Sequence, residues 1–120
     1  MNTGITTVKL KISNPLDPKK YIEDKFLVDS GASLTVLPSS IVNKLGLKPV
    51  YEKEFFLADG KVIKRKVGGA LVSFKGISLP SPVVLGEKGD SKLLGALTLE
   101  AMGLALDPFE RKIYKAKLFL

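Results

Sequence analysis

The segment FLVDSGASLTVL, residues 26–37, decides the fold that the sequence predicts. Its three leading apolar residues indicate the end of a buried strand, and Asp29 follows them directly. Gly31 permits a tight turn and a close backbone approach, so we expect the Asp29 carboxylate to lie half desolvated among amide donors. An ordinary polar turn is the alternative for this tripeptide, because Asp, Ser and Gly all favour turns through local hydrogen bonds.

A second segment adds to the first. Residues 92–103, KLLGALTLEAMG, place two apolar residues and a glycine ahead of a short expected helix. Together, in this order, the two segments resemble the signatures of the retropepsin-like aspartic proteases, the single-lobe family that includes retroviral proteases and their cellular relatives. The chain also has a hairpin-turn sequence at residues 57–61, where that family places its flap, and a strand-like run at 83–86 before the second signature.

The resemblance implies an all-β, retropepsin-like acid-protease barrel with one or two short helices, formed by residues 1–120 as a single domain and functional as a C2 homodimer. Asp29 would be the catalytic residue of an aspartic endopeptidase that cleaves extended, largely apolar segments. Ser30 and Gly31 would support the active-site loop, Ser30 by a hydroxyl that joins the two loops across the dimer axis. Gly31 and Ala32 would leave main-chain groups open to substrate. The remaining implied residues serve substrate binding (Ala32, Ser33, Leu34, Leu57, Ala58, Asp59, Gly60 and Leu93) and the second signature (Leu94 and Gly95).

The implied chemistry also fixes the number of chains in the enzyme. Of the two signatures only the first carries an aspartate, so one chain supplies one such carboxylate. Aspartic-protease chemistry needs two carboxyl groups that share a proton, one acting as base toward a bound water while the other donates to the substrate carbonyl. A C2 homodimer would bring Asp29 against its symmetry mate, because an isologous interface places identical residues on the axis. We expect activity to be greatest on the acidic side of neutrality.

The composition excludes several other enzyme classes. Without cysteine the chain has neither a disulfide framework nor a thiolate metal site, and without histidine it has no histidine-based triad and little access to zinc chemistry. Carboxylate, hydroxyl, lysine and tyrosine chemistry remains, so we expect no cofactor and no metal. A length of 120 residues with 45% hydrophobic content fits one globular domain.

Charge and hydropathy bear on partners and location. No apolar run approaches the roughly 20 residues of a membrane span and no signal-peptide core is present, so a cytoplasmic protein without a membrane partner is expected. The formal net charge of +7 invites a nucleic-acid partner. The basic residues are scattered in strand alternation, however, and no tract interleaves them with aromatic residues, which argues against that partner. Only residues 64–66, Lys-Arg-Lys, form a compact cluster, for which solubility is favoured over an acidic partner.

Periodicity predicts mostly strands. Residues 7–12 alternate apolar and polar side chains, and the Asn-Pro-Leu-Asp-Pro run at 14–18 ends them. An Asp-Gly pair at 59–60 between apolar-rich segments predicts a hairpin. Further strands are expected at 35–37, 70–74, 83–85, 104–106 and 113–120, with turns at 75–76 and 107–110.

One short helix is expected after the first signature. Pro38, followed by two serines, opens it, and Gly46 stops it. Its apolar side chains at Ile41, Val42 and Leu45 then face inward.

Several positions depart from the best-known pattern of the resembled family. Ser30 replaces the commoner threonine but keeps the hydroxyl, and Ser33 and Leu34 stand where retroviral enzymes carry acidic residues that hold substrate main chain. The flap carries Asp59 and lacks a glycine-rich tip. The tail at 115–120 is longer than the dimer-forming strand of retroviral enzymes, and it either builds the dimer interface or completes the monomer's sheet. This tail makes the chain look closer to the cellular and prokaryotic relatives.

Two other functions stay open from the sequence. The main alternative to the enzyme is a catalytically weak or inactive peptide-binding or dimerisation module on the same fold, and the third is a basic barrel that binds nucleic acid. The intact Asp29-Ser30-Gly31 sequence favours the enzyme, because a desolvated carboxylate is costly to keep without a use.

Overall fold

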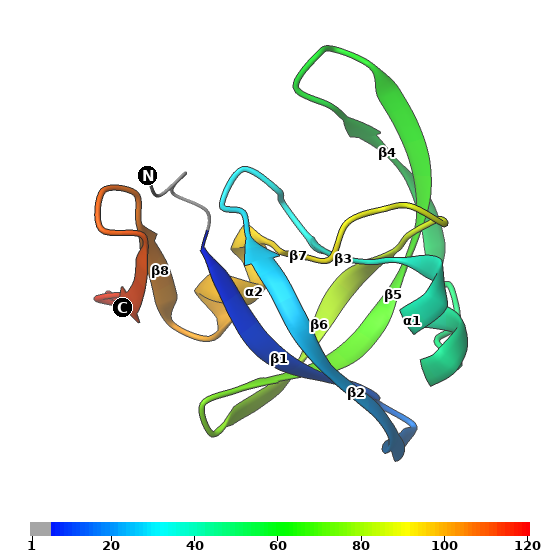
Figure 1. The fold of residues 1–120 in the computed structure, drawn as a ribbon, viewed down its shortest axis with the longest axis horizontal. Helices are drawn as coiled ribbons and strands as arrows, with labels where there is room; N and C mark the ends of the chain where they lie inside the picture. The colour runs from blue at the N-terminus through cyan, green and yellow to red at the C-terminus, as the bar shows by residue number, and fades with distance from the viewer. Residues whose placement is uncertain (1–5) are drawn as a thin grey trace.

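The computed structural model describes residues 6–120 and contains nine strands and two short helices in that range (Figure 1). The predicted all-β fold with one or two short helices is therefore confirmed. The elements in chain order are β1 (Thr7–Asn14), β2 (Asp17–Val28), β3 (Thr35–Leu37), α1 (Ser39–Leu45), β4 (Tyr51–Phe56), β5 (Val62–Phe74), β6 (Ile77–Leu85), β7 (Leu93–Leu94), α2 (Ala96–Ala101), β8 (Leu104–Asp107) and β9 (Lys112–Lys115).

Seven strands form one curved sheet in the order β1-β2-β7-β3-β6-β5-β4, and a further pairing of β1 with β5 folds the sheet back on itself. Two long antiparallel hairpins, β1 with β2 and β5 with β6, make up most of it. The short strand β7 is parallel to β2 and antiparallel to β3. β8 and β9 form a separate antiparallel pair at one side of the molecule (Figure 1). This topology places residues 92–95 beside the end of β2.

The core lies on the inner side of the curved sheet. Along β1, Leu10 and Ile12 are fully buried while Lys9 and Lys11 are exposed, as the alternation predicts. Phe26 on β2 is also fully buried and belongs to the same cluster. Burying one large apolar side chain contributes roughly 1.5–3 kcal/mol. Tertiary packing of this kind therefore holds the strands that carry the candidate site.

Helix α1 has the boundaries that its sequence predicts. Gly46 ends it at φ +66°, a left-handed conformation that glycine adopts without a steric cost. Ile41 and Leu45 are buried, and Val42 packs half-buried against the core. Within the described chain, neither this helix nor α2 is long and apolar enough to cross a membrane.

The C-terminal segment is shorter as a strand than predicted. β9 ends at Lys115, and residues 116–120 form no strand. One more backbone bond, from the amide of Ala116 to the carbonyl of Gly103 at 2.8 Å, follows the β8–β9 ladder. The ladder cannot extend further because β8 begins at Leu104, directly after the turn that follows α2. The tail therefore does not complete the sheet of this monomer, and its last three side chains are exposed.

Candidate active site

Asp29 directly follows the last residue of β2 and is half-buried. Its amide donates to the carbonyl of Leu94 at 3.0 Å, and its carbonyl accepts the amide of Ala32 at 3.1 Å. The amide of Gly31 donates to Asp29 Oδ1 at 2.9 Å. A Cβ at position 31 would lie only 3.2 Å from the same oxygen. Glycine at this position thus leaves space for the carboxylate and supplies an amide donor to it.

The two sequence signatures lie side by side. Leu27 pairs with Leu93 and Val28 with Leu94 in parallel register, while Val36 pairs with Leu93 from the other side. β7 therefore lies between the strand that leads into Asp29 and the strand that follows its loop (Figure 1).

The first turn of α2 is bonded to the Asp29 loop. The amide of Ala96 donates to the carbonyl of Ala32 at 2.8 Å, and the amide of Leu97 donates to the carbonyl of Ser33 at 3.1 Å. Because the amide of Ala32 also bonds to Asp29, both main-chain groups of Ala32 have partners within the chain. The expectation that Ala32 leaves main-chain groups open to substrate is therefore wrong: its backbone binds the loop to α2.

The side chains expected around Asp29 differ in burial. Ser30 and Ser33 are exposed, and Leu34 and Leu93 are half-buried. Leu94 is fully buried, so it belongs to the core while its neighbour Leu93 faces partly outward.

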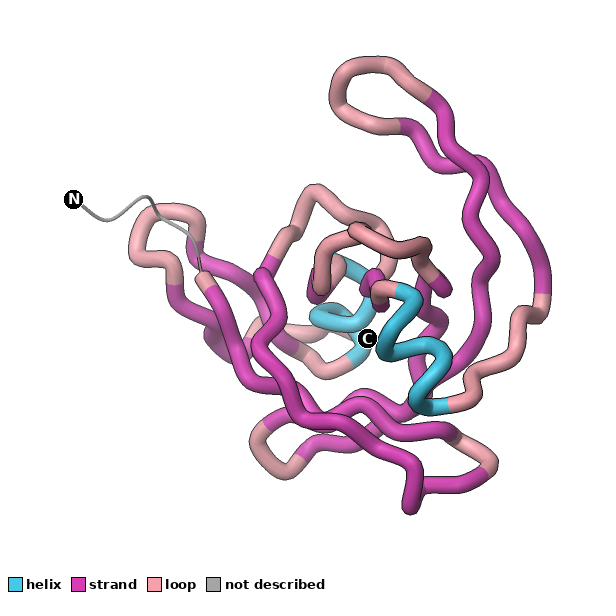
Figure 2. Tube along the Cα trace, turned by 45° about the vertical axis from the view of Figure 1, so that its right-hand side comes forward, coloured by secondary structure: helices cyan, strands magenta, loops and turns pink. Residues whose placement is uncertain are grey.

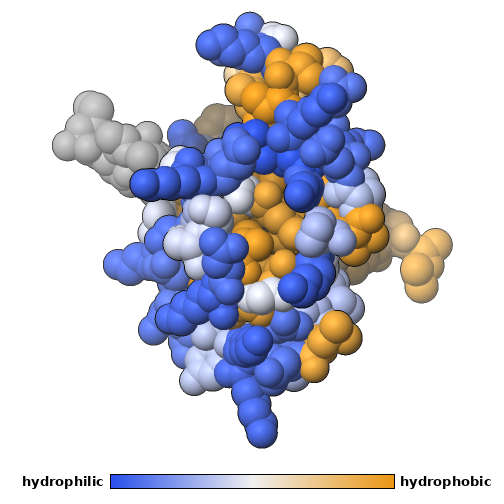
Figure 3. Space-filling model, turned by 90° about the vertical axis from the view of Figure 1, so that its right-hand side faces the viewer, coloured by the Kyte–Doolittle hydropathy of each residue, from blue (hydrophilic) through white to orange (hydrophobic). Residues whose placement is uncertain are grey.

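The predicted flap is a hairpin of β4 and β5 that projects from the body, and its tip stands clear of the Asp29 loop (Figures 1 and 2). Leu57 donates its amide to the carbonyl of Lys61 at 2.8 Å, and Asp59 Oδ1 accepts the amide of Lys61 at 2.9 Å. Ala58 and Gly60 in the same turn are exposed. The apolar side chains Phe56, Leu57 and Val62 are also exposed beside the tip, and Figure 3 shows apolar surface at this end of the molecule. The hairpin thus presents apolar groups without a partner in the monomer.

A buried chain of hydroxyl groups, which the sequence did not predict, lies beneath the site. Thr35 Oγ1 accepts the amide of Gly95 at 3.1 Å and lies 2.7 Å from Thr98 Oγ1, which lies 2.9 Å from Ser81 Oγ. Ser81 donates its one proton to the carbonyl of Pro82 at 3.2 Å. Ser81 must therefore accept from Thr98, and Thr98 in turn must accept from Thr35. Each hydroxyl proton makes one hydrogen bond, and these three hydroxyl groups join β3, α2 and β6.

The sequence did contain a signal for these residues. Thr35 and Thr98 stand among apolar residues in segments predicted to be buried, and a buried polar side chain requires a hydrogen-bond partner. Their partners depend on which strands become neighbours, and the spacing of the residues does not give that.

We expect Thr98→Val to lower the free energy of unfolding by about 1–3 kcal/mol, because it leaves the Thr35 proton without an acceptor and Ser81 without a donor in a buried place. Thr98→Ser keeps the hydroxyl and should cost less than about 1 kcal/mol for the lost methyl group. Urea unfolding of both variants measures the difference. Equal losses in the two variants would show that packing, and not the hydroxyl chain, determines the stability here.

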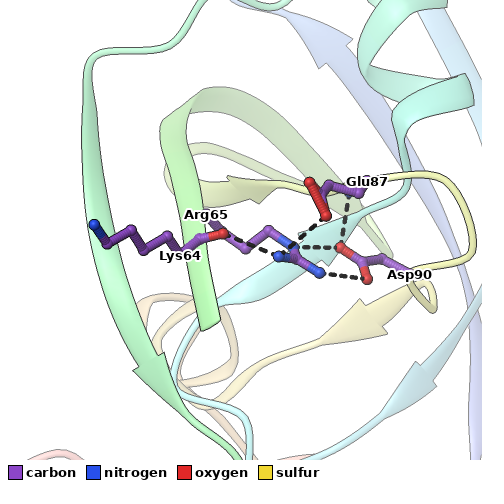
Figure 4. A network of polar contacts seen from close by, with 4 residues as sticks. All are labelled: Lys64, Arg65, Glu87 and Asp90. Atoms are coloured by element: carbon purple, nitrogen blue, oxygen red, sulfur yellow. Dashed lines mark hydrogen bonds and ion pairs between the residues drawn. The ribbon is translucent and has the colours of Figure 1, made fainter. Parts of the chain in front are cut away.

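A second polar network joins the flap to the loop between β6 and β7 (Figure 4). Arg65 on β5 makes two hydrogen bonds to Asp90, from Nε at 2.8 Å and from Nη2 at 3.1 Å, and its Nη1 lies 3.3 Å from Glu87 Oε1. The carboxylate of Asp90 also accepts the amide of Glu87 at 2.8 Å. Arg65, the middle residue of the basic cluster at 64–66, therefore has its charge paired within the chain, and its network links the return strand of the flap to the segment that leads into β7.

The hydrogen bonds from Arg65 hold the pKa of Asp90 below its usual value. A carboxylate with a lowered pKa in the folded state stabilises the fold above the ordinary aspartate pKa, and this contribution is lost as the pH falls through the folded-state pKa. We expect Asp90→Asn to reduce stability by about 1–2 kcal/mol at pH 7, with the difference from wild type shrinking below about pH 4. Unfolding curves across this range test it, with exposed Glu100→Gln as control. A deficit that persists unchanged at low pH would contradict the assignment to the ion pair.

The described residues contain no group of three or more acidic side chains gathered closely enough to hold a metal ion. The chemistry that the arrangement offers is that of a half-buried carboxylate at a strand end, with an amide donor on one oxygen.

Comparison with known proteins agrees with this geometry. The family model described as gag-polyprotein putative aspartyl protease matches residues 22–101. That range includes Asp29, the projecting hairpin and both residues of β7. No curated protein matches the sequence at a significant level.

Three solved structures are similar in fold. The EIAV protease complexed with the inhibitor HBY-793 has a TM-score of 0.60 and 19% identity over 97% of this chain and 93% of that chain. The simian foamy virus (mac) protease has a TM-score of 0.52 and 17% identity over 79% of this chain and 94% of that chain. A retropepsin-like aspartic protease from Rickettsia conorii has a TM-score of 0.50 and 24% identity over 89% of this chain and 88% of that chain. These likenesses confirm the predicted retropepsin-like fold, and the bacterial enzyme, with the highest identity of the three, confirms the expected likeness to prokaryotic relatives.

Proposed function

The chain belongs to the family of gag-polyprotein putative aspartyl proteases, and from this premise we propose that it is a homodimeric aspartic endopeptidase. The observation that carries the proposal is the placement of Asp29, half-buried at the end of β2 with the Gly31 amide on its carboxylate and with Leu94 beside it. Only one aspartate stands in the two signature segments, so the catalytic pair requires a second copy of the chain.

In the proposed dimer, the two Asp29 carboxyl groups meet on the two-fold axis and hold one proton between them, because two like charges so close are not both stable. The ionised carboxylate takes a proton from a bound water, which attacks the peptide carbonyl carbon, and the protonated carboxyl donates to the carbonyl oxygen. Collapse of the tetrahedral intermediate breaks the C–N bond: the leaving amine takes the proton that the first carboxylate received from water, and a hydroxyl of the intermediate returns its proton to the second carboxylate, so the pair again holds one proton. The exposed hydroxyl of Ser30 would bond across the axis and hold the two loops together.

The substrate in this proposal is an extended, largely apolar peptide segment. The exposed apolar groups at the flap tip, Phe56, Leu57 and Val62, support this choice because they gain contacts only when the hairpin closes over a ligand. Half-buried Leu34 and Leu93, and exposed Ser33, would line the other side of the cleft.

A mixing experiment tests the need for two carboxylates. Wild-type protein at fixed concentration is mixed with increasing amounts of Asp29→Asn, and cleavage of an unstructured protein is measured at about pH 5 after the subunits have exchanged. Random pairing with a ninefold excess of the variant leaves about a tenth of wild-type chains paired with one another, so activity should fall about tenfold. Bovine serum albumin in place of the variant is the control for crowding.

Unchanged activity in the mixture, with exchange demonstrated by a labelled chain, would contradict a shared site. Absence of cleavage by a well-folded wild-type dimer across pH 3–7 and a broad set of substrates would favour the catalytically weak or inactive peptide-binding module instead.

A further inference from the structure

A basic groove of about 590 Å³ lies between the start of β1, the β5–β6 turn and β9, and no residue of the Asp29 loop lines it. Its apolar lining comes from Val8, Phe74 and Ile113, and its charged lining comes from Lys9, Lys75 and Lys112, with no acidic residue in the lining. The groove therefore combines an apolar floor with a cationic rim. Acidic residues outside this lining lie near two of the three lysines: Glu23 is 3.7 Å from Lys9, and Asp107 stands opposite Lys112 in the β8–β9 pair. Lys75 and Lys112 are chosen to report the rim charge because their substitution leaves the Lys9–Glu23 ion pair intact.

One wall of this groove is an open strand edge. The ladder between β1 and β5 covers only Lys11 to Ser13. Backbone groups alternate in direction along a strand, so Thr7 and Lys9 present their N–H and C=O groups on the same side as Lys11. β5 has turned away into the hairpin at Phe74 by that point, and no strand within residues 6–120 pairs with this part of the edge. An unpaired edge of this kind can accept an extended peptide.

Two cationic residues near the groove have a backbone conformation that their side chains disfavour. Lys75 has φ +46° and precedes Gly76 at φ +81°, so both central residues of this two-residue hairpin turn are left-handed. Such turns favour Asn-Gly. Arg111, whose carbonyl accepts the Thr6 hydroxyl at the edge of the groove, has φ +60°. Within residues 6–120 these are the two non-glycine residues with positive φ. Local preference alone does not select lysine at position 75, and a sustained local cost of this kind points to a function.

We propose that this groove binds an extended peptide with alternating acidic and apolar residues, which adds to the edge of β1 as a further strand. Main-chain bonds to Thr7 and Lys9 supply register, the lysines bind the acidic side chains, and the apolar floor receives the alternate side chains. The proposal concerns a surface outside the Asp29 site and does not rest on proteolytic activity.

A peptide fits this surface better than a nucleic acid does. Single-stranded nucleic acids bind through bases stacked on open aromatic rings, and the aromatic ring in this groove, Phe74, is half-buried with Lys75 Nζ 5.4 Å from its centroid. The strand edge also offers alternating amide and carbonyl groups that match a peptide backbone.

The test is fluorescence anisotropy with a labelled, acetylated Glu-Val-Glu-Leu-Glu-Val-Glu amide at low salt. Wild type and Asp29→Asn should bind it equally, because the active site is not involved. The double variant Lys75→Glu, Lys112→Glu should bind about tenfold more weakly or worse. The matched control Lys19→Glu, Lys44→Glu changes net charge by the same amount on exposed residues of β2 and α1, and it should stay within about twofold of wild type.

Two modified probes separate strand addition from charge attraction. One probe is N-methylated at its odd-numbered residues and the other at its even-numbered residues. Each of these two phases keeps the charge of the parent peptide and loses about half of its amide donors. The phase whose amides face β1 should bind about tenfold more weakly, while the other should bind like the parent. Equal binding of both phases, equal weakening in the control pair, or displacement by an equally charged single-stranded oligonucleotide at the same concentration would each overturn the proposal.

Lys75→Asn provides an independent check on the strained turn. Asparagine suits the first position of this turn, so the variant should unfold about 3 °C higher than wild type and yet bind the acidic probe several-fold more weakly. A variant that gains stability and keeps full affinity would show that Lys75 has no part in binding.

Discussion

Asp29→Asn is expected to abolish cleavage by the proposed enzyme while leaving the proposed dimer folded. The substitution keeps the size of the side chain and its acceptor oxygen for the Gly31 amide, but it removes the group that takes a proton from water. Loss of a positioned general base lowers turnover by about 10³-fold or more. The measurement is kcat/KM on an unstructured protein between pH 3 and pH 7, with sedimentation under the same conditions to establish that the variant remains a dimer.

The matched control for this variant is Asp59→Asn at the flap tip. Asp59 accepts the amide of Lys61 within its turn and is exposed, so its loss should alter KM more than kcat. If Asp29→Asn cleaved the substrate within about tenfold of the wild-type rate, Asp29 would not be a catalytic residue.

Gly95→Ala is expected to have the largest effect on stability, a loss of about 3 kcal/mol or more in the free energy of unfolding. A Cβ at this position would lie 2.3 Å from the carbonyl carbon of Leu34, 2.4 Å from its oxygen and 2.8 Å from the amide nitrogen of Thr35. These are backbone atoms of the Asp29 loop, so no side chain can rotate away. The variant must separate α2 from that loop, and it should lose activity together with stability.

Gly69→Ala is the internal comparison. Nothing lies within 4 Å of a Cβ at that position in β5, and its φ is not positive, so alanine there should be neutral or stabilise by about 0.4–1 kcal/mol through the unfolded state. Soluble yield and urea unfolding of both variants measure the contrast. A Gly95→Ala protein as stable as Gly69→Ala would mean that the two signature segments are packed less tightly than the distances around Gly95 indicate.

The elements that the sequence predicted well are those set by local chemistry. The Asp-Gly turn at 59–60, the alternation along β1 and the glycine stop of α1 each follow from conformations that neighbouring residues impose. The two signature segments, in this order, also predicted membership of one family, and the family match covers the first segment and residues 92–101 of the second.

The features that sequence did not predict depend on long-range register. The hydroxyl chain of Thr35, Thr98 and Ser81 joins three different elements. Arg65 was predicted to belong to a solvated basic cluster, and its contact with Asp90 depends on how β5 lies against the loop between β6 and β7. Ala32 was expected to leave main-chain groups open to substrate because the local sequence does not reveal that its carbonyl accepts the amide of Ala96 in α2. The tail after Lys115 was predicted as a strand, but its potential partner β8 begins at Leu104, opposite Lys115, and offers no residue to pair with the tail.

The position of β7 also bears on how the protein folds. This strand has only two residues, yet it lies between β2 and β3, which precede it by about half of the chain. Contacts between segments so far apart form late, since the entropy of closing the long intervening loop must be overcome first. On a ribosome, β1 to β6 can begin to pair while Asp29 still lacks its bond to Leu94, so the carboxylate acquires its final surroundings only after residues 92–103 have emerged. The candidate active site thus forms only when both signature segments are available.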